Sequence, residues 1–64
     1  MMEIQVMKDG RWVTESSRGR RAEALALAEK FLARKDCAGA RVIANKENRD
    51  GLMDEEVVFE KTQA

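Results

Sequence analysis

The sequence contains no histidine and a single cysteine, Cys37. A lone cysteine excludes a disulfide framework within one chain, which is typical of proteins from a reducing compartment. Without histidine, a metal site would depend on carboxylates, and the acidic run of residues 54–56 lacks the spacing of a calcium-binding loop. We therefore expect no metal and no cofactor, and we interpret Cys37 as an incidental thiol rather than a reactive one.

Long hydrophobic runs are also missing. No apolar run approaches the roughly 18 residues that a membrane span requires, and the N-terminus lacks the apolar core of a signal peptide. We therefore expect a cytoplasmic protein that does not bind membranes.

Neither charge is in excess, because Lys and Arg together number 12 and so do Asp and Glu. Overall charge thus does not favour nucleic acid as a partner. The distribution is uneven, since residues 1–35 carry eight basic and five acidic side chains, whereas residues 36–64 carry four and seven. These opposite excesses predict charge pairing within the fold or between copies of the chain.

The length of 64 residues predicts one domain, residues 1–64, with 62–64 as a loose tail. A chain of about 60 residues buries only roughly 60% of its unfolded surface, so a monomer is marginally stable. With no disulfide to support it, we expect close packing or self-association to supply the remaining stability.

The segment from Arg20 to Lys35 is predicted to form a helix. Its apolar residues recur at helical spacing, and charged residues occupy the remaining faces. The segment has no glycine, proline or β-branched residue. The apolar positions are Ala24, Leu25, Leu27, Ala28, Phe31 and Leu32. A stripe of this width requires a partner, which two predicted hairpins, one on either side of the helix in the sequence, can supply.

Two hairpins flank this helix in the sequence. In the first, residues 2–8 alternate between apolar and polar, Asp9-Gly10 is a strong turn signal, and residues 11–15 form the returning strand. This turn places Met7 opposite Trp12. Residues 16–19 connect the hairpin to the helix, with Ser16 or Ser17 as the expected cap.

The second hairpin is predicted from residues 40–46 and 55–61, with Asp50-Gly51 as its turn. This turn aligns apolar with apolar residues and acidic with basic residues along the two strands. The expected pairs are Val42–Phe59, Ala44–Val57, Ile43–Val58, Arg41–Glu60 and Lys46–Glu55.

These elements predict an α+β fold of the ββαββ type, a four-stranded sheet of two hairpins with one helix packed on one face. The topology and length resemble the β-grasp. That resemblance implies the sheet order 2-1-4-3, numbering strands along the chain, with the first and last strands as a central parallel pair. No ligand-binding residue follows from it.

A single helix leaves the second face of the sheet uncovered. By the alternation of the strands, Met7, Trp12, Ile43 and Val58 lie on that face. Tryptophan and methionine are enriched at interface centres, so these residues predict a protein-contact surface, used by a homodimer or by an accessory domain. The alternative is that these residues lie at the sheet periphery or under the long second hairpin, where the stems of Arg41 and of lysines partly shield them.

Arg18, Arg20 and Arg21 at the helix start form the second candidate site, which would bind an anion or a nucleic-acid backbone. The alternative is a solvated turn whose arginines pair with acidic residues of segment 54–56. We find no catalytic or cofactor motif, and a domain of this size lacks the volume for an active-site pocket, so we do not expect an enzyme.

Overall fold

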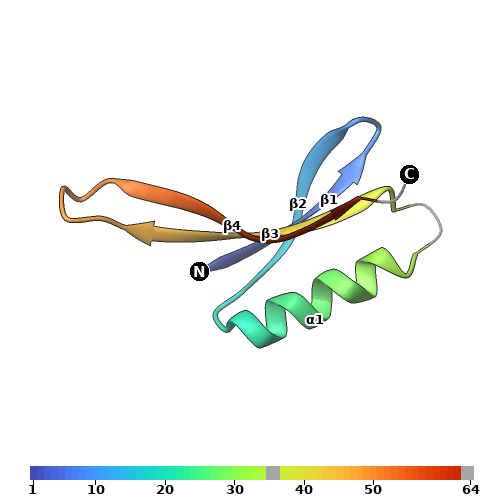
Figure 1. The fold of residues 1–64 in the computed structure, drawn as a ribbon, viewed down its shortest axis with the longest axis horizontal. Coiled ribbons are helices and arrows are strands. Elements are labelled where there is room, and N and C mark those ends of the chain that lie inside the picture. Colours follow the sequence, from blue (N-terminus) through green and yellow to red (C-terminus); the bar gives the residue numbers. More distant parts are fainter. Residues whose placement is uncertain (35–36, 63–64) are drawn as a thin grey trace.

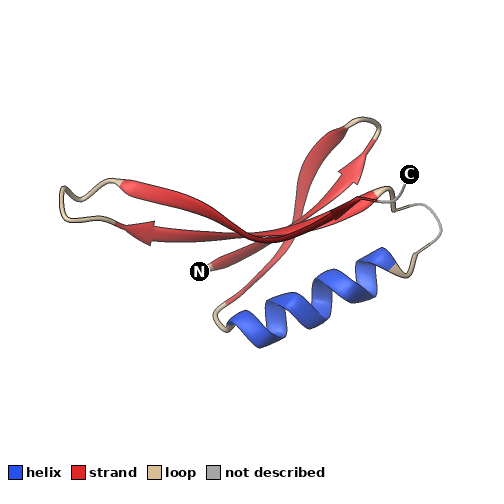
Figure 2. Cartoon of the chain, viewed as in Figure 1, coloured by secondary structure: helices blue, strands red, loops and turns tan. Residues whose placement is uncertain are grey.

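The computed structural model describes residues 1–34 and 37–62. Its elements follow the predicted ββαββ order: β1 (Met2–Lys8), β2 (Arg11–Arg18), α1 (Arg21–Leu32), β3 (Gly39–Glu47) and β4 (Met53–Thr62). The four strands form one antiparallel sheet, and α1 lies against one side of it (Figures 1 and 2). No helix in the described residues is long and apolar enough to cross a membrane.

The strand order is β2-β1-β3-β4, so the predicted order 2-1-4-3 is wrong. β1 pairs with β3 in the antiparallel direction, and β4 lies at the edge. The described strands therefore contain no central parallel pair, and the sheet does not have the β-grasp arrangement that the resemblance implied.

The side chains that face α1 explain this order. Ala40, Val42 and Ala44 of β3 pair with the buried side of β1, and all three are themselves buried. β4 turns Glu56 and Lys61 toward the same side of the sheet. In a central position β4 would bury both charges beneath the helix, which is unfavourable without partners. At the edge both side chains remain exposed.

The first hairpin has the predicted turn. Asp9 and Gly10 both have positive φ, 51° and 81°, as a type I′ turn requires. The predicted register is confirmed from the turn to Gln5, beyond which β2 carries an extra residue at Glu15. β2 continues to Arg18, so Ser16 and Ser17 are strand residues and the prediction that one of them caps the helix is wrong.

The second hairpin is confirmed only in the half far from its turn. Arg41–Glu60 and Val42–Phe59 pair as predicted. Nearer the turn the pairs are Ile43–Val57, Ala44–Glu56 and Lys46–Asp54, one residue away from the prediction. The predicted two-residue turn is replaced by a longer loop in which Gly51 alone has positive φ. This loop shifts the register near the turn by one residue, and a bulge at Val58 returns the two strands to the predicted register.

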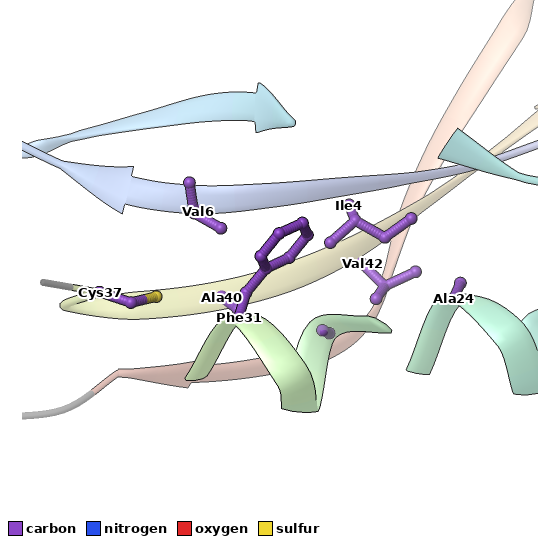
Figure 3. Close-up of a cluster of buried hydrophobic side chains, with 8 residues drawn as sticks. Ile4, Val6, Ala24, Phe31, Cys37, Ala40 and Val42 are labelled. Carbon is purple, nitrogen blue, oxygen red and sulfur yellow. The ribbon is translucent and has the colours of Figure 1, made fainter. Parts of the chain in front are cut away.

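The hydrophobic core lies between α1 and the two central strands (Figure 3). Ile4 of β1 and Val42 of β3 are completely buried, and the helix covers them with Ala24, Ala28 and Phe31. Alanine at two successive turns of the helix allows its backbone to approach the sheet closely. The predicted apolar stripe is confirmed, since Leu25, Leu27 and Leu32 pack around this core.

The β3–β4 hairpin extends well beyond the helix at one end of the molecule (Figure 1). Leu52 and Met53 near its tip are largely exposed. Thr62, predicted to belong to a loose tail, is the last residue of β4. The helix ends at Leu32 rather than at Lys35, and residues 35–36 and 63–64 lie outside the described residues.

Candidate functional site

The side of the sheet away from α1, called the open face below, carries a row of polar side chains that crosses all four strands. Thr14 of β2 pairs with Gln5 of β1, Gln5 pairs with Arg41 of β3, and Arg41 pairs with Glu60 of β4. Their side chains are linked as well. Arg41 Nε donates to Gln5 Oε1 at 2.6 Å, and Gln5 Nε2 donates to Thr14 Oγ1 at 3.2 Å. We call these four residues the polar row.

Arg41 joins the polar row to the single tryptophan of the chain. Its guanidinium carbon lies 4.4 Å from the centroid of the Trp12 ring, which is the geometry of a cation–π contact. Arg41 Nη1 also lies 3.9 Å from Glu60 Oε1. Because three neighbours hold the guanidinium, the arginine and the indole form one ordered unit that is still partly exposed.

Three of the four predicted contact residues lie on the open face. Met7 and Trp12 are cross-strand partners at one end of this face, and both are partly buried. Ile43 lies on the other side of the polar row and is only 5% exposed. The predicted patch is therefore divided by Gln5 and Arg41, and the guanidinium group of Arg41 covers part of it by lying over the Trp12 ring.

Val58, the fourth predicted residue, lies elsewhere. It is the extra residue of the β4 bulge and packs against the core on the helix side of the sheet. The bulge exchanges it with Val57, which pairs with Ile43 on the open face and is 51% exposed. The predicted Ile43–Val58 pair is therefore wrong, and Val57 is the residue that sequence reasoning missed.

The charges of the open face are mostly negative. Strand pairing places Glu3, Glu55 and Glu60 on it, whereas Arg41 is its basic residue within the described strands. Arg41 is engaged with Trp12 and Gln5 and lies near Glu60. This face therefore presents apolar groups beside carboxylates and repels phosphate groups.

The arginines of the second candidate site lie around the start of α1, and all three are exposed. Arg20 is the residue before the helix and makes no side-chain capping bond, and Arg21 is the first helical residue. Arg18 Nη1 donates to Ser16 Oγ and to the Ser17 carbonyl oxygen, both at 2.6 Å. Within the described residues none of the three forms an ion pair, so the predicted pairing with segment 54–56 is not present.

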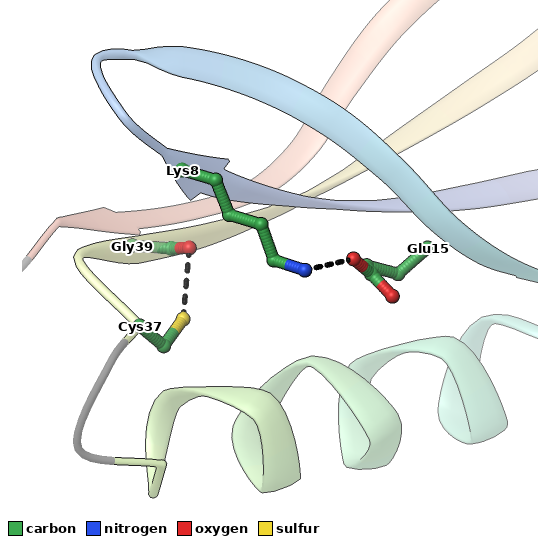
Figure 4. A network of polar contacts seen from close by, with 4 residues as sticks. All are labelled: Lys8, Glu15, Cys37 and Gly39. Atoms are coloured by element: carbon green, nitrogen blue, oxygen red, sulfur yellow. Dashed lines mark hydrogen bonds and ion pairs between the residues drawn. The ribbon is translucent and has the colours of Figure 1, made fainter.

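Cys37 lies on the helix side, near the end of the first hairpin (Figure 4). Its thiol is buried and donates to the Gly39 carbonyl oxygen at 3.1 Å. The pocket beside it, lined by Val6, Phe31 and Arg34 among others, has a volume of about 30 Å³, room for about one water molecule.

An ion pair lies near this thiol. Lys8 Nζ lies 2.7 Å from Glu15 Oε1 (Figure 4), so the extra residue of β2 reaches back to the end of β1. The hydrogen bond of the Cys37 thiol and the Lys8–Glu15 ion pair are both contacts within the fold, and we assign no site to either of them.

Comparisons of this chain with protein-family models, with curated proteins and with solved structures gave no match.

Proposed function

We propose that the chain is a small, non-catalytic interaction domain that binds another protein through its open face. The observation that carries this proposal is Trp12, a partly exposed indole held in place by Arg41 and flanked by Met7. Tryptophan and arginine are the residues most often found at interface hot spots, and an ordered pair loses little side-chain entropy on binding.

The chemistry of the open face indicates what kind of partner it accepts. Trp12, Met7 and the exposed Val57 offer apolar contact. The carboxylates of Glu3 and Glu55 lie on the Val57 side of the polar row. The matching surface is a protein patch with an apolar centre and lysine or arginine side chains around it. A nucleic-acid backbone is disfavoured by the same carboxylates.

The test compares Trp12→Ala with Val13→Ala, its neighbour on the opposite side of β2. A protein captured from a cell extract by the wild-type chain is purified, and its affinity for each variant is measured by calorimetry. Loss of a hot-spot tryptophan weakens binding by about 30-fold or more. Val13→Ala is expected to change affinity less than about twofold, since surface substitutions away from a contact have small effects.

Three outcomes contradict the proposal. Trp12→Ala binding as tightly as wild type removes the open face from the contact. A partner lost on mutation of Arg18, Arg20 and Arg21, with a steep salt dependence, indicates the anion-binding alternative. Failure of the wild-type chain to retain any protein overturns it as well. A second copy bound through this face would appear as a dimer mass that Trp12→Ala abolishes.

A further inference from the structure

The outer edge of β4 has no covering element among the described residues. β4 is ten residues long, pairs with β3 only, and is exposed over most of its length. α1 lies over β1 and β3, so it leaves the edge of β4 open. An open edge of this length presents a row of backbone donors and acceptors to which a further strand can add.

The bulge at Val58 decides which strand fits this edge. Before it, Asp54 and Glu56 face the helix side, and after it Phe59 and Lys61 face that side. The alternation of side chains therefore shifts by one residue in the middle of β4. A regular strand matches only one half of such an edge, whereas a strand with the same shift at the same place matches both halves.

We propose that the partner is a second copy of this chain, with β4 paired antiparallel to β4 and the two-fold axis between Val58 and Phe59. In this register the facing positions are 55 with 62, 56 with 61, 57 with 60, and 58 with 59. The β3–β4 register, together with the packing of Val58 against the core, places both members of each pair on the same side of the sheet. With the axis between residues 57 and 58 instead, Val57 of one copy would pair with Val58 of the other. These two residues face opposite sides of the sheet, so this register does not fit.

The charges of β4 select the same register. Glu56 of one copy faces Lys61 of the second copy, and symmetry forms this pair twice. Within the chain both residues pair across the strand with alanines, Ala44 and Ala40, and neither makes an ion pair among the described residues. The shifted register instead sets Glu55 against Glu60, a like-charge pair that is destabilising.

The apolar contacts agree with the charges. Val58 of each copy faces Phe59 of the other on the helix side, and both residues are partly exposed in the single chain. Phe59 also lines an open groove beside Leu32, the last residue of α1, and Ala33, which follows the helix. Pairing at β4 extends the sheet across both copies and sets their open faces side by side. This inference does not depend on the proposed function, which uses the open face rather than the edge.

The test is a charge exchange monitored by sedimentation equilibrium over a range of concentrations up to millimolar. Glu56→Lys and Lys61→Glu each replace two attractive pairs by two repulsive ones, and each is expected to weaken the dimer about tenfold or more. The double variant has lysine at position 56 and glutamate at position 61, so each pair is attractive again with its two charges exchanged. Its dimer dissociation constant is expected to lie within about threefold of the wild-type value. The matched control, Glu55→Lys, makes the same charge change opposite Thr62 and is expected to leave dimerisation nearly unchanged.

A wild-type chain that remains monomeric at millimolar concentration overturns this inference. So does a dimer that tolerates Glu56→Lys, or one that the double variant fails to restore. A dimer abolished by Trp12→Ala but insensitive to Glu56→Lys places the contact on the open face instead. Circular dichroism verifies the fold of each variant. If a charge-reversal variant does not fold, Glu56→Gln is measured in its place, since it removes the attraction to Lys61 without introducing a repulsive pair.

Discussion

The guanidinium carbon of Arg41 lies 4.4 Å from the centroid of the Trp12 ring, although these residues belong to strands that are not adjacent in the sheet. β1 lies between them, and its Gln5 accepts a hydrogen bond from Arg41 Nε. The contact therefore connects three of the four strands on the open face. It links the two hairpins through side chains on the face opposite the core.

Arg41→Ala is expected to destabilise the fold by about 1–2 kcal/mol, because it removes the cation–π contact and a hydrogen bond to a partly buried amide. Trp12 is the only tryptophan, so its fluorescence reports the change directly. Loss of the covering guanidinium is expected to shift its emission to longer wavelength. Arg49→Ala serves as the control, because Arg49 is exposed in the loop of residues 48–52 between β3 and β4, called the distal loop. An unchanged emission maximum in Arg41→Ala would show that the two side chains do not stack in solution.

Gly39→Ala is expected to destabilise the fold by about 1–3 kcal/mol, as overpacking does. A Cβ atom at Gly39 would lie 3.0 Å from the Lys61 carbonyl oxygen and 3.2 Å from Thr62 Cα, both of which are backbone atoms of β4. Gly19→Ala is the matched control, since a Cβ atom there meets nothing within 4 Å. That change is expected to be neutral or stabilising by up to about 1 kcal/mol. Urea unfolding measures both, and equal midpoints would contradict the close approach at Gly39.

Ala28→Leu tests the close packing of α1 on the sheet. Ala28 is completely buried, so a larger side chain must displace the helix from β1 and β3, at a cost of about 1–3 kcal/mol or more. Ala26→Leu makes the same change on the exposed side of the helix and is expected to alter the free energy of unfolding by less than about 0.5 kcal/mol. Thermal unfolding compares the two, and a similar stability for both variants would place the helix farther from the sheet.

Asn48→Ala is expected to loosen the distal loop without unfolding the core. Asn48 Oδ1 accepts hydrogen bonds from the backbone N–H groups of Asp50 and Leu52, at 2.9 and 3.0 Å. Losing this acceptor costs about 1 kcal/mol locally. Amide hydrogen exchange is expected to accelerate at Asp50 and Leu52 but not at Val42 in the core. Asp54→Ala, which removes only the hydrogen bond that Asn48 Nδ2 donates to Asp54 Oδ1 at 3.3 Å, is the control and is expected to leave exchange at Asp50 and Leu52 near that of wild type. Exchange that accelerates equally at Val42 in Asn48→Ala would show that the hairpin and core unfold together.

Local features of the chain were determined by the sequence alone. The helical stripe from Ala24 to Leu32, the type I′ turn at Asp9-Gly10 and the Arg41–Glu60 pair all follow from residues close together or from one turn assumption. Each depends on short-range geometry, namely the periods of helix and strand and the backbone preferences of glycine. The same reasoning predicted the ββαββ element order.

The strand order, the two bulges and the composition of the open face were decided by the tertiary structure. β3 became central because it can bury Ala40 and Ala44 under the helix, whereas β4 would have to bury Glu56 and Lys61. A bulge adds one residue and moves every later side chain to the other face, which exchanged Val57 with Val58. Alternation along a single strand does not reveal such a shift, because it arises from the sum of contacts with neighbouring strands and the helix.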